Sequence, residues 1–208
     1  MNELLNSIRL LGRVTAAPEY DHTVLGEAFY RMELSAGRLS GNEDVIPITV
    51  PGRLMTCLGE FPAVGAVVSV NGQIRSYNHR QDGQSRLAVT VFAKELTPVD
   101  RREAEQDLNE AELTGHICKP VVYRLTPFSR EIADMLLAVN RRYGRSDYLP
   151  CIAWGRNARF AGSLSAGDTI TIKGRLQSRQ YTKALPGGET EQRMAYEISC
   201  SSIERREV

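Results

Sequence analysis

The stretch LPCIAWGRN at residues 149–157 repeats, in altered form, the stretch IPITVPGRL at residues 46–54. Residues 29–53 align with residues 132–156 without a gap, and eight positions are identical, against about one or two expected at average residue usage. The identical pairs are Met32 and Met135, Leu34 and Leu137, Arg38 and Arg141, Gly41 and Gly144, Asp44 and Asp147, Pro47 and Pro150, Gly52 and Gly155, and Arg53 and Arg156. A single domain present in two copies explains this agreement.

The repeat extends over most of the chain when loops are allowed to differ in length. Glycines recur at Gly12 and Gly115, at Gly65 and Gly167, and at Gly72 and Gly174. Between the copies, the segment DRREAEQDLNEAE at 100–112 is charged and nearly free of large apolar residues. We therefore place a linker at 100–108, a first domain at 1–99 and a second domain at 109–208.

The repeat also decides the structure of residues 129–144, SREIADMLLAVNRRYG, which have helical propensity when read alone. In the first copy apolar residues alternate with polar ones, and the second copy has apolar residues at the same positions. These residues are Tyr30, Met32, Leu34 and Ala36 in the first copy and Ala133, Met135, Leu137 and Val139 in the second. A period of two with one apolar face predicts a half-buried strand in both copies.

The remaining segments of each copy also have the patterns of strands. The long segments AVVSVNGQIRSY and TITIKGRLQSRQY each contain one interior glycine, which indicates a bulge or a tight bend. The segments GRLMTCLGEFPAVG and GRNARFAGSLSAG leave room for a short helix or turn between the third and fourth strands. About five strongly coiled strands per copy predict an all-β chain of two tandem five-stranded barrels of the OB-fold type.

The composition excludes several classes of protein. No apolar run reaches the roughly 18 residues that span a membrane, and the N-terminus lacks a signal-peptide pattern, so we expect a cytoplasmic protein that does not bind membranes. The four cysteines form no CxxC pair and have no histidine cluster, so we expect reduced thiols, at least two of them buried, and no metal site. No catalytic motif is present, so we expect neither an enzyme nor a cofactor.

The net charge of +1 is unevenly distributed along the chain. Residues 1–108 have 11 basic and 14 acidic side chains, whereas residues 109–208 have 15 basic and 11 acidic ones. The second copy is therefore the better suited to meet a polyanion.

Single-stranded nucleic acid binds to a small barrel through aromatic rings that stack on bases and through Arg or Lys side chains that contact phosphates. The second copy supplies both kinds of residue. Tyr148 and Trp154 flank its third strand, and Tyr181 lies at the end of the fourth. The basic candidates around these rings are Arg141, Arg142, Arg145, Arg156, Arg159, Lys173, Arg175, Arg179 and Lys183.

The first copy lacks these three rings. Val45, Pro51 and His79 stand at their positions, so we expect its stacking platform to be lost or moved to Tyr77, with basic candidates at Arg53 and Arg75. For Trp154 alone, packing explains a tryptophan on a strand as well as base stacking does. The combination of rings and cations in one copy favours binding.

Several of these motifs together resemble the bacterial single-stranded DNA-binding proteins. They are GRV followed by PEY, then ADMLLAVNRRYG, AWGRNARF and GDTITIKGRLQSRQYT, with NSIRLLGRVTAAPEY, PITVPGRL and VGAVVSVNGQIRSY in the first copy. The resemblance implies OB folds that wrap single-stranded DNA without strong sequence preference and protect it in replication, recombination and repair. It also implies stacking at Tyr148, Trp154 and Tyr181, and a nucleoid-associated location.

The resemblance further implies an assembly of four barrels, which two chains of two barrels would reach as a homodimer. Typical members end in a disordered stretch with an acidic tip that recruits repair proteins. This sequence ends SSIERREV directly after the last expected strand. We therefore do not expect recruitment of repair proteins through such a tail.

Two other readings remain open at this point. The chain could be an OB-fold protein-interaction module, for example a primosome-like accessory, in which case the aromatic residues would not serve the main activity. It could also bind single-stranded RNA, since stacking on a base does not distinguish the two sugars.

Overall fold

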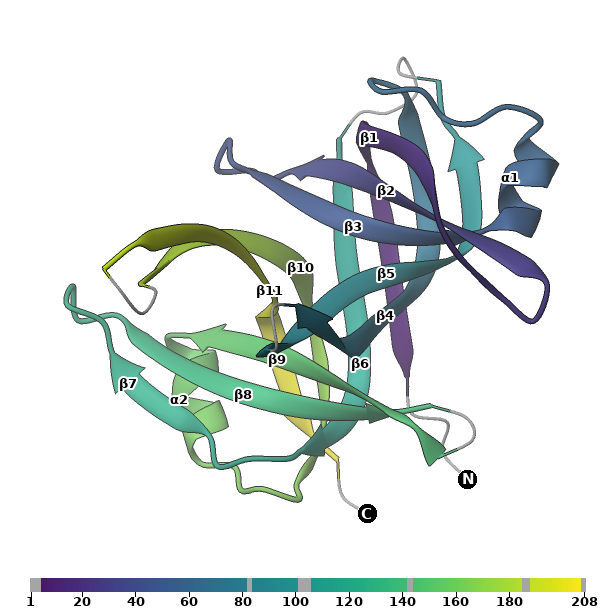
Figure 1. Cartoon of the computed structure of the whole chain (residues 1–208). Coiled ribbons are helices and arrows are strands. Elements are labelled where there is room, and N and C mark those ends of the chain that lie inside the picture. The colour runs from purple at the N-terminus through teal and green to yellow at the C-terminus, as the bar shows by residue number, and fades with distance from the viewer. Residues whose placement is uncertain (1–4, 82–83, 101–105, 142–143, 185–187, 207–208) are drawn as a thin grey trace.

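The computed structural model of the chain describes residues 5–81, 84–100, 106–141, 144–184 and 188–206, and it consists almost entirely of β-strands (Figure 1). Each copy of the repeat forms one closed barrel, and the two barrels lie side by side. The predicted all-β chain of two five-stranded barrels is thereby confirmed.

The first barrel contains five strands and one short helix. Its strand order is β2-β3-β5-β4-β1, and a further pairing of β1 with β2 closes it. The elements are β1 (Asn6–Val24), β2 (Glu27–Gly37), β3 (Glu43–Pro51), α1 (Gly52–Leu58), β4 (Val67–Gln81) and β5 (Gln84–Pro98).

The second barrel repeats this plan, but the segment equivalent to the outer half of β1 forms a separate strand, β7, which the sequence analysis did not predict. The elements are β6 (Leu108–Ile117), β7 (Val122–Leu125), β8 (Glu131–Asn140), β9 (Ser146–Trp154), α2 (Arg156–Gly162), β10 (Thr169–Ala184) and β11 (Thr190–Arg205). The strand predicted against helical propensity is β8. Strand β6 begins at Leu108, the last residue of the predicted linker 100–108, and residues 101–105 lie outside the described residues.

The interior glycines of the long strands lie at bends, as predicted. Gly72 and Gly174 each follow a β-bulge, and a Cβ atom at either position would collide with a carbonyl oxygen of the neighbouring strand. Beyond the first bend, the Asn6 side chain replaces a strand partner, because its amide bonds both the N–H and the C=O of Ile74 at 2.8 Å. Asn109 repeats the arrangement in the second barrel.

The two barrels are joined by antiparallel pairing of β1 with β6. Ile8 pairs with Ala111, and these two residues occupy the same position of the repeat. The pairing is therefore centred on a pseudo-twofold axis, and both barrels belong to one continuous sheet of eleven strands.

A second contact between the barrels consists of two equivalent sets of hydrogen bonds, which we call the cross-domain lock. In one set, Asp147 of β9 pairs with Arg141 and accepts a hydrogen bond from the Ser76 N–H of β4 at 2.6 Å. The Ser76 hydroxyl in turn accepts a bond from the Tyr148 N–H at 2.7 Å.

The other set of the lock has the same chemistry with the domains exchanged. Asp44 of β3 pairs with Arg38 and accepts a hydrogen bond from the Ser178 N–H of β10 at 2.8 Å, while the Val45 N–H donates to the Ser178 hydroxyl. The side chains of Asp44 and Asp147 are 1% and 0% exposed. A carboxylate buried to this degree depends on its partners, because an unpaired buried charge is costly.

The cysteines behave as predicted, since all four are free thiols and two are buried. A hydrogen bond with the neighbouring Cys200, together with burial, raises the pKa of the Cys151 thiol well above its usual value. The thiol therefore stays protonated and is a poor nucleophile.

We expect Asp147→Asn to lower the free energy of unfolding by about 2–4 kcal/mol, because it leaves the Arg141 guanidinium without its counter-charge at a buried site. The effect is measured by urea unfolding. The matched control is Asp134→Asn, whose carboxylate pairs with Arg124 but is 40% exposed; its removal costs about 0.5 kcal/mol or less. Equal stability of the two variants would show that the lock does not stabilise the chain.

Candidate nucleic-acid interface

Strand β9 presents two aromatic rings on its outer face. Its alternation places Leu149, Cys151 and Ala153 in the core, whereas Tyr148 and Trp154 point outward and are 47% and 42% exposed. Neither ring belongs to the hydrophobic core cluster. Both rings are thus available to a ligand that lies along the outer face of the second barrel.

The β10–β11 hairpin adds the third predicted ring. Tyr181 is half-buried on β10, and the guanidinium carbon of Arg179 lies 5.8 Å from the centre of its ring. Arg193 stands opposite Tyr181 on β11, and its hydrogen bonds to Glu191 lower the pKa of that carboxyl. The hairpin arches toward the side of the barrel on which β7 and β8 lie (Figure 1).

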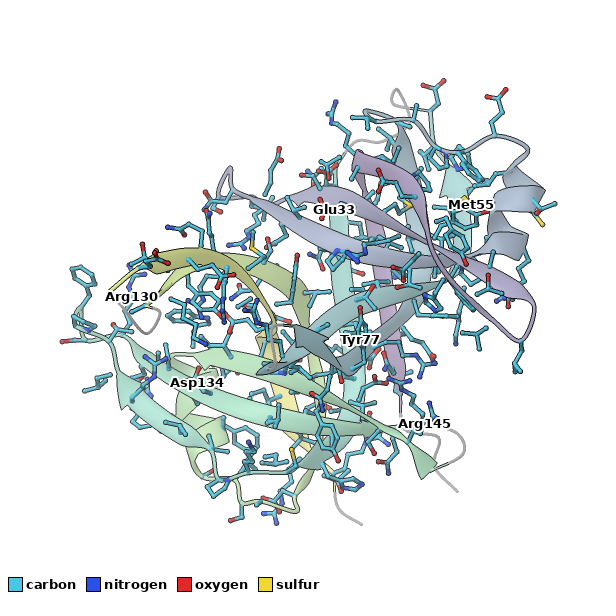
Figure 2. The ribbon with its side chains drawn as sticks, viewed as in Figure 1. Glu33, Met55, Tyr77, Arg130, Asp134 and Arg145 are labelled. Carbon is cyan, nitrogen blue, oxygen red and sulfur yellow. The ribbon has the colours of Figure 1, made fainter. Side chains whose placement is uncertain are left out.

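Strand β7 widens this outer face beyond what the sequence predicted. In the strand register Arg124 pairs with Ile132 of β8, and Ile132 pairs with Trp154 of β9, so the three side chains form one row across the sheet. Arg124 donates a hydrogen bond from Nε to the Asp134 carboxylate at 3.0 Å, and Figure 2 labels Asp134 on β8. Nothing in the periodicity of this four-residue strand distinguishes it from a loop, so Arg124 was missed.

Several cations of the second domain are held by carboxylates of the same domain. Arg179 of the hairpin lies 3.7 Å from Glu197, whereas Arg159 of α2 pairs with Glu131 at 2.9 Å beside Tyr123, away from this face. Lys183 stands opposite Glu191 in the hairpin.

Two other predicted cations of the second domain have no such partner. In the part of the chain that the structure describes, Arg145 and Arg156 are exposed and form no ion pair. Figure 2 shows Arg145 at the turn between β8 and β9.

Three predicted binding residues belong to the cross-domain lock or its surroundings. Arg141 pairs with Asp147 inside the lock. Arg75 lies 3.6 Å from the Asp147 carboxylate and Arg175 lies 3.8 Å from that of Asp44. Burial and the like charge of Arg141 lower the pKa of Arg75. These guanidiniums therefore have an evident role in joining the two domains.

The remaining predicted residues are more widely spread. Lys173 lies 3.8 Å from Glu112 of β6, before the bend at Gly174, and so on a different part of the barrel from Tyr181. Arg53 of α1 pairs with Glu27. Arg142 and the side chain of His79 lie outside the described residues.

Tyr77 is 51% exposed on β4 of the first domain. It follows Ser76, the residue that bonds the Tyr148 backbone, and Figure 2 shows it where the two domains meet. The structure therefore brings the strand of Tyr77 beside that of Tyr148.

The chemistry of this surface is that of contact with a ligand. Among the residues with described positions, no three His, Cys, Asp or Glu side chains are grouped so that they could hold a metal ion. No helix among these residues is long and apolar enough to cross a membrane. The face offers exposed rings and arginines, which is the combination that binds bases and phosphates.

Comparison with known proteins agrees with this chemistry. The chain matches the "Single-strand binding protein family" twice, over residues 5–99 and 108–206. The Single-stranded DNA-binding protein of Thermus aquaticus is 27% identical over 205 residues, which are 86% of this chain and 78% of that protein. Single-stranded DNA-binding protein 1 of Staphylococcus aureus is 32% identical over 104 residues, or 47% of this chain and 60% of that protein.

Solved structures are similar over the whole chain. A variant of the single-stranded DNA binding protein from Thermus aquaticus, 25% identical, superposes with a TM-score of 0.78 and covers 100% of this chain and 97% of its own. The wild-type protein gives a TM-score of 0.80 at 24% identity, with coverages of 99% and 95%. This likeness confirms the predicted pair of tandem OB-fold barrels. Since the family match includes both repeats and nearly every residue between the termini, the chain belongs to the Single-strand binding protein family.

Proposed function

We propose that this chain binds single-stranded DNA without strong sequence preference, and that the bases lie on the outer face of β8 and β9, beside the β10–β11 hairpin. Family membership supports the activity itself, together with the roles in replication, recombination and repair that are typical of the family. The observation that carries the choice of surface is the exposure of Tyr148 and Trp154, at 47% and 42%, outside the core of the barrel.

Stacking explains how such a face binds any sequence. Every base has a π-face, so a ring of Tyr or Trp accepts each of them, and a stacked base contributes about 1–3 kcal/mol. Tyr148, Trp154 and Tyr181 lie on two elements of the same barrel, so a single strand of DNA could contact all three rings. Rings on rigid strands also lose little side-chain entropy on binding.

The phosphates have to compete with carboxylates of the protein. Arg124 and Arg179 each contact an acid of the same domain, so a phosphate that binds one of them replaces or joins that acid. Exposed ion pairs are weak, at about 0.2–1 kcal/mol, and such an exchange costs little. The acids reduce non-specific attraction of other polyanions, and the rings then supply most of the affinity.

We also propose that the chain acts as a homodimer. Two chains would bring four barrels together, the number that the resemblance of the sequence implies. A strand of DNA could then pass from one barrel to the next within a single assembly.

The addition of oligo(dT) should quench the fluorescence of Trp154, the only tryptophan in the chain, because a base stacks on its indole. Tyr148→Leu should weaken binding about tenfold, and the loss is measured by titration of that fluorescence at fixed salt. Emission that does not change when oligo(dT) is added, with no mobility shift at low salt, would contradict the proposed function.

Tyr123→Leu is the matched control for the loss of a tyrosine. Tyr123 is 43% exposed, but its hydroxyl bonds Glu131 and its ring lies against Gly162 of α2, away from the face that we propose. Its removal should leave the affinity unchanged.

Competition by oligo(rU) in the same titration measures the preference between DNA and RNA.

Asp134→Asn should strengthen binding about two- to fivefold at low salt, because it frees the Arg124 guanidinium for a phosphate. The gain should shrink as salt rises, since exposed charges are screened. The control is Glu110→Gln, which removes an exposed partner of Arg9 at the junction of β1 and β6. An equal gain in both variants would mean that only net charge matters.

Sedimentation equilibrium should give a mass of about twice the 23.2 kDa of one chain, because two chains complete the set of four barrels. A mass that stays at 23.2 kDa over the whole concentration range would contradict the dimer.

A further inference from the structure

We propose that the first domain has a binding site of its own for the bases of single-stranded DNA, formed by His22, Phe29 and Phe92. This inference rests on the proposed function. It differs from the sequence-based expectation, which allowed the first domain at most a platform at Tyr77. We call these three side chains the ring row.

The ring row crosses the outer surface of the first barrel from strand to strand. The rings of His22 on β1 and Phe29 on β2 are stacked, with centroids 5.0 Å apart and planes 16° from parallel. The Phe29 ring lies 6.0 Å from that of Phe92 on β5. Arg75 of β4 ends the row, with its guanidinium carbon 5.8 Å from the centre of the Phe92 ring. Three π-systems and one cation thus lie in contact over four strands.

The row lies outside the core of the barrel. Core positions of the same strands are held by Met32, Leu34, Val91 and Ala93, while neither Phe29 nor Phe92 packs against the core cluster. Both phenylalanines are half-buried, and the side chain of His22 is 48% exposed. A base can therefore extend the stack on the outer side of the His22 ring, which a hydrogen bond between Nδ1 and Asp21 holds in place.

Comparison of the two domains shows why these rings matter. Trp154 of the second domain pairs with Ile132 of β8, and Ile152, two residues before it on β9, pairs with Ser199 of β11. In the first domain Pro51 pairs with Phe29 of β2, and Thr49 pairs with Phe92 of β5. In this region of the barrel, one domain has a ring on the middle strand, and the other has a ring on each of the two neighbouring strands.

Pro51 occupies the position of Trp154 in the first domain. The proline is buried, and it lies between two strands that both carry rings. The aromatic surface has therefore moved by one strand in each direction and has not been lost. A comparison of aligned positions misses these rings, because each ring of the row aligns with a non-aromatic residue of the second domain.

The surroundings of the row also suit a nucleic acid. Arg31 and Arg53 are 64% and 56% exposed, and each lies within 4 Å of a single exposed or half-exposed acid. This is the same pattern of cations held by carboxylates that borders Tyr148 and Trp154. The two sites therefore share their chemistry although they share no aligned ring.

The test starts from the variant Tyr148→Leu/Trp154→Leu, which removes two exposed rings of the second domain. Fluorescence anisotropy of labelled oligo(dT) should show weakened but measurable binding by this variant. The further substitution of Phe29→Leu and Phe92→Leu keeps apolar volume but removes the rings. It should lower the remaining affinity at least about fivefold, the equivalent of one stacked base, with little change in the salt dependence.

His22→Ala provides a second variant in the same background, because His22 is exposed and its removal leaves the barrel core intact. It should also weaken the remaining binding. The matched control is Phe61→Leu, which removes a ring that is 51% exposed and touches Tyr30 but lies off the row. Unchanged affinity in both the phenylalanine and the histidine variants would overturn the proposal. An absence of oligo(dT) binding by the wild-type chain would instead overturn the proposed function.

Discussion

The arrangement of this protein depends on two buried carboxylates that are satisfied across the boundary between its domains. Asp44 and Asp147 each hold an arginine of their own domain and accept a backbone N–H from the other. Neither barrel can turn relative to its partner without breaking the hydrogen bonds that these buried carboxylates accept from the other domain. The pairing of β1 with β6 fixes the same relation through backbone hydrogen bonds. The two barrels are thus held in one fixed orientation.

The arginines of the chain divide into two groups with different tasks. One group, which includes Arg38 and Arg141, takes part in the contact between the domains. The other, which includes Arg124 and Arg179, lies on the surface of the second barrel and is held by acids of the same domain. The net charge of +1 agrees with this division of the arginines, because most cations already have an anionic neighbour. Such a surface attracts polyanions only moderately, and selectivity for unpaired strands then comes from rings, which a duplex cannot engage because its bases are already stacked.

The sequence predicted the features that repeat locally and missed those that depend on distant contacts. The alternation of Met135, Leu137 and Val139 outweighed helical propensity because the first copy showed the same period, and β8 is indeed a strand. The bends at the interior glycines followed from residue type alone. Strand β7 is too short to have a period, and its residues are exposed. The lock and the ring row join strands that lie far apart along the chain, so no local sequence pattern predicts them.

The join between the barrels, with Ile8 beside its own repeat counterpart Ala111, has a genetic consequence. In an assembly of single-barrel chains, every codon change is copied into all barrels at once, so a substitution that harms one barrel harms all of them. Here the axis relates two separately encoded halves. Equivalent positions of the two halves can therefore differ, as Pro51 and Trp154 do. Because the two barrels are encoded separately within one chain, their sequences are free to differ.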